Sequence, residues 1–305
     1  FFKQKTAYEI GTGDWSSDVC SSDLTTGIER YGKVKPAVLD KTVMYDGEYY
    51  AVGGKRIKSK TDSKSDNTHF ILALAALGEE LKFRNLSPRN VVISEGLPLE
   101  RCVADKQAFD EEYYKKGKDI YFEYEDVPYN VHILDVLVNP QGVSAVIDKT
   151  HELPSTCLLV DVGTWTIDML PVFDAKPSNG EALSIDLGVA ECFKRCQREL
   201  RRRGLGQIFE EQIIKEMRAL PSGLSDAYTT PLREVFREYS KLVAETLVEE
   251  GYNLKATPCI FLGGGSIVIA NYGKEYFPLA EYMSDIHANA IGYEKIAKIK
   301  MRKRR

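Results

Sequence analysis

A short stretch in the middle of the chain constrains its fold more than any other. Residues 158–170 read LLVDVGTWTIDML, a buried apolar strand, an acidic residue, a glycine turn with hydroxyl groups, and a second strand. We expect a hairpin that can hold a phosphate and a hydrated metal ion. Asp161 at the strand end can orient Mg²⁺ through its waters, and the backbone at Gly163 and Thr164 can donate to an anion. An ordinary glycine turn after a strand-ending aspartate would give the same pattern.

Length, charge and cysteine content narrow the classes of protein that remain. A chain of 305 residues can bury a large core, and two lobes are expected. The net charge of −4 gives no basic footprint for direct nucleic-acid binding, and no apolar run approaches the roughly 20 residues of a membrane span. The scattered cysteines predict a reducing, cytoplasmic setting. Cys192 and Cys196 lie four residues apart, but no second Cys or His pair at ligand spacing follows, so a zinc site is not expected.

The first 24 residues are set apart from the fold. Residues 1–24 carry no sustained period of 2 or 3.6 and no apolar core of the length that a signal peptide needs. They resemble translated sequencing-adapter read-through, in which 21–24 repeats the pattern of 16–19. We therefore expect a non-native or disordered segment, and a genuine disordered N-terminus is the alternative.

Strands and helices alternate along the rest of the chain, which predicts an α/β architecture in two lobes. Asp46-Gly47 predicts a tight hairpin turn, and a further turn is expected at Pro128-Tyr129-Asn130. Pro231 is expected near the first turn of a long helix. Pairs of strands joined by a turn are expected at 43–52 and 158–170, and single strands at 91–97, 120–124, 131–138 and 258–262. Helices are expected at 67–83, 105–115, 143–148, 189–203, 207–220, 231–250, 267–272 and 285–305.

A second glycine site follows the last buried strand. Residues 263–266 read GGGS between a strand and a helix, and three glycines there would let a flat or charged ligand approach the backbone. The run matches neither the Walker pattern, because no Gly-Lys-Ser/Thr follows, nor the dinucleotide fingerprint, because no third glycine has the required offset. A flexible joint between strand and helix is the alternative.

These two sites together resemble the motifs of the actin/Hsp70/sugar-kinase ATPase superfamily. Residues 161–164 look like its second phosphate motif, and 261–266, about a hundred residues later, look like its adenosine motif. Within the superfamily the chain is most similar to the ParM/StbA group of actin-like plasmid-partitioning proteins. The similarity covers about residues 40–295, and further matching segments are 50–53, 72–77, 91–98, 138–142 and 288–292.

The resemblance implies a fold and a domain organisation. The fold class is α/β, an actin-like two-lobed ATPase fold with ribonuclease H-like lobes and an incomplete first lobe. The implied divisions are 1–24 as the excluded segment, 25–145 as lobe I, 146–284 as lobe II, and 285–305 as a C-terminal helix that packs back on lobe I.

The resemblance also implies a function and its site residues. Proteins of this family polymerise into filaments and hydrolyse ATP to segregate plasmid or phage DNA through a DNA-binding adaptor protein. The implied partners are therefore further copies of the chain and an adaptor, without a membrane, and the implied cofactors are ATP and Mg²⁺. Gln141 would position the attacking water, because phosphoryl transfer needs an oriented water more than a strong base. The remaining implied residues are Asp161 for the Mg²⁺ water shell, Gly163 and Thr164 for the phosphates, Asp186 and Gly188 beside the nucleotide, and Gly263, Gly264, Gly265 and Ser266 for ribose and adenine.

One departure from the family pattern is serious. The family opens with a strand and an Asp-x-Gly-x-x-x-x-Lys hairpin, and nothing in 25–40 supplies it. Residues 11–14 do not replace it, since no apolar strand precedes them. We expect a 5′-truncated reading frame whose product binds ATP weakly. Two alternatives stay open: a non-hydrolysing interaction module, and a metabolite kinase of the same superfamily, for which no substrate base is evident in the first lobe.

Overall fold

The chain folds into two compact units in a computed structural model. The continuous unit is Lys149–Ile286, and the split unit combines Phe2–Asp148 with His287–Arg305. No helix among the described residues is long and apolar enough to cross a membrane. The residues that the structure describes are 7–10, 27–37, 41–54, 68–87, 89–97, 114–147, 149, 152–174, 176–178, 181–283, 285 and 288–302.

A seven-stranded sheet forms the split unit, in the strand order β1-β5-β7-β6-β3-β4-β2. β5 and β7 pair in parallel, and every other neighbouring pair along this order is antiparallel. β7 pairs with β6 over residues 127–132 and with β5 over residues 132–140. The strands are β1 (Ala7–Ile10), β2 (Gly27–Gly32), β3 (Lys41–Tyr45), β4 (Glu48–Gly54), β5 (Asn90–Leu97), β6 (Asp119–Tyr124) and β7 (Val127–Pro140).

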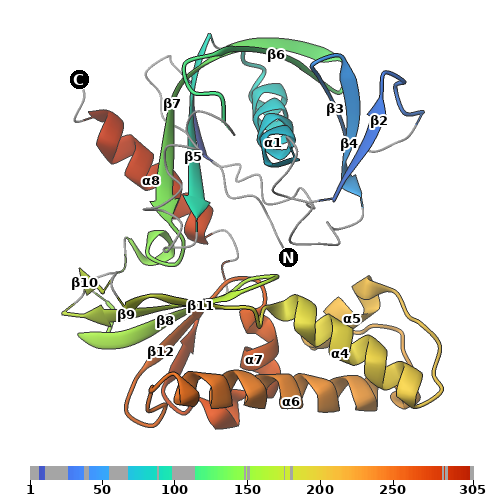
Figure 1. The fold of residues 1–305 in the computed structure, drawn as a ribbon, viewed down its shortest axis with the longest axis vertical. Coiled ribbons are helices and arrows are strands. Elements are labelled where there is room, and N and C mark those ends of the chain that lie inside the picture. The colour runs from blue at the N-terminus through green and yellow to red at the C-terminus, as the bar shows by residue number, and fades with distance from the viewer. Residues whose placement is uncertain are drawn as a thin grey trace. The chain divides into compact units, whose positions relative to one another are not determined.

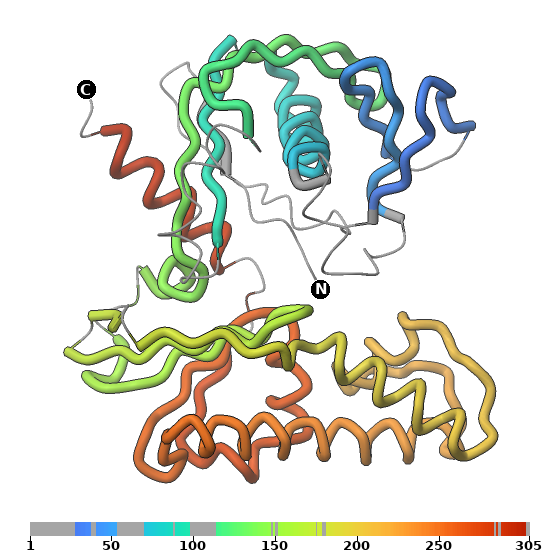
Figure 2. The backbone as a smooth tube through the Cα atoms, in the orientation of Figure 1, coloured from blue at the N-terminus to red at the C-terminus, as the bar shows by residue number. Residues whose placement is uncertain are grey.

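Two helices pack on this sheet. α1 (Thr68–Arg84) carries an almost continuous run of buried apolar residues from Phe70 to Leu77 and packs against β3, β4 and β6. α8 (Ala288–Arg302) comes from the other end of the sequence and packs against β5 and the short 3₁₀ turn η3 (Ser144–Val146). Figure 2 shows this late helix, in red, beside teal β5 and green β7. Ser94 in β5 donates from its Oγ to the Tyr293 carbonyl at 3.0 Å, which fixes α8 on the sheet.

The continuous unit is built on a second, mixed sheet. β8 and β9 form an antiparallel hairpin, and β8, β12 and β13 pair in parallel. All four residues of β12 are buried, as expected for a strand that is covered on both faces. The strands are β8 (Thr156–Val162), β9 (Ile167–Phe173), β10 (Lys176–Pro177), β11 (Leu183–Ile185), β12 (Cys259–Leu262) and β13 (Ala280–Tyr282).

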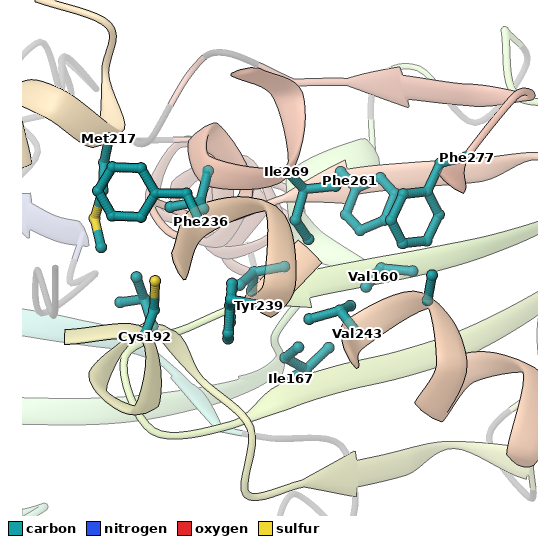
Figure 3. Close-up of a cluster of buried hydrophobic side chains, with 14 of the residues drawn as sticks. Val160, Ile167, Cys192, Met217, Phe236, Tyr239, Val243, Phe261, Ile269 and Phe277 are labelled. Atoms are coloured by element: carbon teal, nitrogen blue, oxygen red, sulfur yellow. The ribbon is translucent and has the colours of Figure 1, made fainter. Parts of the chain in front are cut away.

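Helices enclose one core against this sheet (Figure 1). Figure 3 shows Val160 and Phe261 from the strands meeting Phe236, Tyr239 and other side chains from the helices. The helices are α4 (Val189–Arg202), α5 (Glu210–Met217), α6 (Asp226–Glu249) and α7 (Ser266–Tyr272), with a 3₁₀ turn, η5 (Lys274–Tyr276), after α7.

Several expectations about the elements are confirmed. Asp46 and Gly47 turn the β3–β4 hairpin with φ of 52° and 74°, as a type I′ turn requires. The helices expected at 67–83 and 189–203 and the strands expected at 91–97 and 258–262 are present within two residues of the expected bounds. The helix expected at 105–115 lies almost wholly outside the described residues.

Other expectations were wrong. The turn expected at 128–130 lies at Glu125-Asp126, which have φ of 46° and 68°, so the expected turn residues continue β7. The expected helix at 143–148 is only the turn η3. α6 begins at Asp226, which puts Pro231 in the helix interior rather than in the first turn.

The separate character of residues 1–24 stays a prediction. Within this segment, residues 7–10 form β1 and pair with β5.

Candidate functional site

The hairpin of β8 and β9 presents an acidic residue next to its turn. Asp161 is the last residue but one of β8, and its side chain is buried at 5% exposure. The turn covers 163–166 and is closed by a 2.9 Å hydrogen bond from Gly163 N to Thr166 O. The Thr164 side chain is buried as well. The residues that the sequence proposed for metal and phosphate, Asp161, Gly163 and Thr164, therefore lie within four positions at the end of one buried strand.

Gly163 leaves space beside the turn. A Cβ placed on this residue would have only the Thr166 carbonyl oxygen within 4 Å, at 3.2 Å. That oxygen is a tight contact, but no other neighbour lies within 4 Å, so a ligand atom could approach the backbone from the remaining directions. This arrangement fits the expectation that Gly163 faces a phosphate.

The same turn packs on the start of α4. Val189 N donates to Gly163 O at 3.0 Å, and Ala190 N donates to Thr164 O at 2.8 Å. A Cβ on Gly188 would lie 2.5 Å from the Thr164 carbonyl, so this position has to be glycine. Gly188 therefore lies beside the turn, but the first N–H groups of α4 bind turn carbonyls rather than remaining available for a phosphate. Asp186 lies at an exposed bend just before them.

The glycine run packs against the end of β8. Leu262 and Asp161 are parallel register partners, so 263–266 begins where the acidic residue lies. Gly263 has φ of +78°, and a Cβ there would lie 2.7 Å from Val162 O and nearer still to Asp161 Oδ1. Gly265 N donates to Val162 O at 2.9 Å, and a Cβ on Gly265 would lie 2.6 Å from Val162 Cγ1.

These contacts give a different reason why Gly263 and Gly265 are glycines. The sequence suggested that 263–266 lacks side chains so that a ligand can approach. At Gly263 and Gly265, however, the space that a Cβ would need is filled by the protein's own β8. Ser266 closes the turn by donating from its Oγ to Gly263 O at 2.7 Å, and Gly264 lies half-buried between them.

Gln141 belongs to the split unit, whereas the other predicted residues belong to the continuous unit. It follows β7, where its backbone N–H donates to Leu97 O at 2.9 Å and its Nε2 donates to Gly96 O at 3.1 Å. The next residue, Gly142, donates from its N–H to Asn289 Oδ1 at 2.9 Å. These bonds tie the end of β7 to the end of β5 and to α8, which holds Gln141 on a defined backbone.

Sequence reasoning assigned no role to Asp168. This residue is the register partner of Asp161 across the hairpin. Its carboxylate accepts a hydrogen bond from Ser184 Oγ at 2.5 Å and a longer one from Thr166 Oγ1 at 3.5 Å. Asp168 thus connects the turn to β11. The signal was available, because a four-residue turn makes residues seven apart opposite neighbours.

Tyr239 of α6 binds the backbone just before α4. Its hydroxyl donates to Leu187 O at 2.9 Å, immediately before Gly188. Burial raises the pKa of Tyr239 well above its ordinary value, so this donor stays protonated. The bond anchors α6 to the segment that precedes α4.

The donor set around Asp161 fits a metal that is held mainly through other ligands. Among the described residues there is no group of three or more His, Cys, Asp or Glu side chains that could hold an ion alone. Mg²⁺ usually takes one or two carboxylates and completes its shell with water and phosphate oxygens. A buried carboxylate beside an open glycine turn suits that mode of binding.

Comparison with known protein families and with curated protein sequences gives no match. Solved structures are similar at low sequence identity. The archaeal actin homolog Ta0583 has a TM-score of 0.68 and 19% identity, over 90% of this chain and 92% of that one. The apo pSK41 ParM protein has a TM-score of 0.61 and 18% identity, over 90% of each chain. Bacillus thuringiensis ParM with ATP has a TM-score of 0.63 and 13% identity, over 91% of each chain. The chain therefore has the actin-like α/β fold.

Proposed function

We propose that this chain is an actin-like nucleotide-binding protein that takes up ATP with Mg²⁺ and assembles with further copies of itself. The observation that carries the proposal is the position of buried Asp161 at the end of β8, between the open turn at Gly163 and the glycine run at Gly263. A buried carboxylate and the hydroxyl-bearing residue Thr164 lie at the same strand end, which suits the binding of Mg²⁺ and phosphate.

The residues of the continuous unit have distinct roles in this proposal. Asp161 orients water on the metal, and the turn at Gly163 and Thr164 lies against the phosphates, with the Gly163 N–H itself bonded to Thr166 O. Gly263–Ser266 border the ribose and adenine. Bound Mg²⁺ would supply charge stabilisation for phosphoryl transfer, and Gln141 in the split unit would orient the attacking water.

Nucleotide binding also has support from proteins of the same fold. Ta0583 has been solved in complex with ADP, and Bacillus thuringiensis ParM with ATP and with AMPPNP. Those proteins share no more than 19% identity with this chain. They support the class of ligand, while the residue roles rest on the arrangement around Asp161.

Self-assembly and DNA segregation complete the proposal. One structure of the same fold is an AlfA filament bound to AMPPNP, and another is a non-polymerisable mutant of pCBH ParM. We extend this to filaments that segregate plasmid or phage DNA through a DNA-binding adaptor, as the ParM/StbA-like motifs imply.

ATP hydrolysis measured together with light scattering tests the proposal. ATP-dependent, concentration-dependent scattering with phosphate release is the expected result. Turnover only after addition of a sugar would instead indicate a metabolite kinase. If the protein neither binds nucleotide nor assembles, it is a non-hydrolysing interaction module. That result would contradict the proposal.

A further inference from the structure

A surface groove in the continuous unit lies among α5, α6, α7 and η5. It encloses about 810 Å³. Most of its lining residues are exposed, so it is an open groove rather than a closed chamber. Small ligands are usually buried over most of their surface, whereas an open groove suits a segment of polypeptide. The lining residues are Glu216, Ala219, Leu220, Pro221, Arg233, Arg237, Asn271, Tyr272, Lys274 and Glu275.

The floor of the groove is fixed by internal hydrogen bonds. Tyr272 OH donates to Glu216 O at 2.5 Å, and Asn271 Nδ2 donates to Met217 O at 2.8 Å. The buried Glu216 carboxylate accepts from Ser222 Oγ at 2.5 Å and from Arg233 Nε at 3.2 Å. The negative charge of the floor is therefore already compensated within the protein.

The walls of the groove leave positive charge and apolar surface exposed. Among the described residues no ion pair joins Arg237 or Lys274 to a carboxylate. Leu220 is 50% exposed beside Pro221 at the rim. Glu275 is the opposing charge at the rim, and it lies on the η5 side rather than on α6. The α6 side of the groove thus suits an occupant with an apolar side chain followed by acidic residues.

The chain itself carries such a segment. Phe209 precedes α5 and is 81% exposed, although it is a large apolar residue. Glu210 and Glu211 follow it as the exposed acidic first turn of the helix. We call 208–211 the Phe209 segment. It lies at the N-terminal end of α5, whereas the groove lies at the C-terminal end of the same helix.

We propose that the groove binds the Phe209 segment of a second copy of this chain, with Phe209 against Leu220 and Pro221 and the acidic residues toward Arg237. The inference rests on the proposed self-assembly and names its contact. Because the two surfaces differ and lie at opposite ends of α5, the contact is head-to-tail. Such a contact repeats and builds an open chain of subunits or a ring.

The test uses the full-length protein with ATP and Mg²⁺ in three variants. Phe209→Ala with Glu211→Lys disables the segment, and Arg237→Glu with Lys274→Glu disables the groove. We expect each to raise the critical concentration for assembly roughly tenfold or more, as removal of a central interface contact does. Lys255→Glu, an exposed charge reversal outside both surfaces, is the control and should assemble normally. Circular dichroism melting confirms that every variant folds.

A mixing experiment gives the most specific signature. The segment variant retains a groove, and the groove variant retains a segment, so equal amounts of the two should form dimers and stop there. Analytical ultracentrifugation distinguishes these dimers from the monomers of each variant alone. Normal assembly of either variant, or no dimers in the mixture, would overturn the inference.

A direct binding measurement separates this inference from the proposed function. A fluorescein-labelled peptide of residues 206–213 should bind the full-length protein without ATP, and at least tenfold more weakly to the groove variant. The same peptide carrying Phe209→Ala should lose binding. If the wild-type protein never assembles with ATP but binds this peptide, the proposed function fails and the groove contact stands. Absence of peptide binding together with normal filaments would overturn the contact and leave the function intact.

Discussion

Replacing Gly263 with alanine tests whether the glycine run is required by the packing of β8. Gly263 has φ of +78°, in the left-handed region that costs an alanine about 1 kcal/mol. Its Cβ would also press on Val162 O and on the Asp161 carboxylate. Overpacking of this kind costs a further 1–3 kcal/mol or so. We therefore expect Gly263→Ala to lower the free energy of unfolding by about 2–4 kcal/mol.

A matched glycine separates the two contributions. Gly204 follows α4 in the same unit and has φ of +71°, but a Cβ there would meet nothing within 4 Å. Gly204→Ala should therefore cost only the backbone strain, about 1 kcal/mol. Urea denaturation of both variants, followed by the fluorescence of Trp165 in the turn, measures the difference.

The comparison has a clear refuting result. If Gly263→Ala is no less stable than Gly204→Ala, the close packing against β8 is not a constraint, and the glycines need another explanation. If Gly263→Ala is destabilised as expected, it should also bind ATP more weakly, because Asp161 has to move from its position beside the turn.

Three further outcomes are expected. Gly292→Ala should lower the free energy of unfolding by about 2–3 kcal/mol, because the new Cβ would overlap the Ser144 carbonyl and push α8 off η3. Limited proteolysis should then show earlier cleavage near the C-terminus, and an unchanged cleavage rate would contradict this prediction. Gln141→Ala should slow ATP hydrolysis while sparing ATP binding in a titration; equal loss of both would remove its proposed role. Burial raises the pKa of the Cys157 thiol to about 11 and that of Cys259 to about 12, from 9.0. Because the folded pKa values are raised, the free energy of unfolding should be unaffected by these thiols below about pH 9 and should fall as the pH rises toward 12. In urea denaturation, a variant with alanine at both positions should therefore lose less free energy of unfolding between pH 9 and pH 12 than the wild-type protein.

Local turn chemistry explains which parts of the fold were predictable. Asp46-Gly47 is a dipeptide that adopts positive φ readily, so its hairpin is evident from the sequence. The β6–β7 turn uses Glu125-Asp126 in the same backbone region, but it has no glycine, glutamate is not a typical choice there, and the neighbouring Pro128 gives a misleading signal. Pairing of 7–10 with β5 is a long-range contact that no local pattern announces.

The sequence predicts which residues lie together at the candidate site, but it does not show why glycine is required at each position. Asp161, Gly163 and the glycine run lie together because two parallel strands, β8 and β12, end at the same edge of the sheet. Glycine patterns do not show whether a missing Cβ makes room for a ligand or for the protein itself. The structure assigns the second reason to Gly263 and Gly265, whereas a Cβ on Gly163 would meet only the Thr166 carbonyl oxygen. Asp168 went unassigned because its role depends on cross-strand register.

Isothermal titration of the full-length protein with ATP, with and without Mg²⁺, tests the central claim most directly. The account predicts saturable binding of ATP that Mg²⁺ strengthens in the wild-type protein. In an Asp161→Asn variant that melts normally, ATP should still bind, but Mg²⁺ should no longer strengthen the binding. Absence of ATP binding in the wild-type protein, or an equal Mg²⁺ effect in both proteins, would contradict the account.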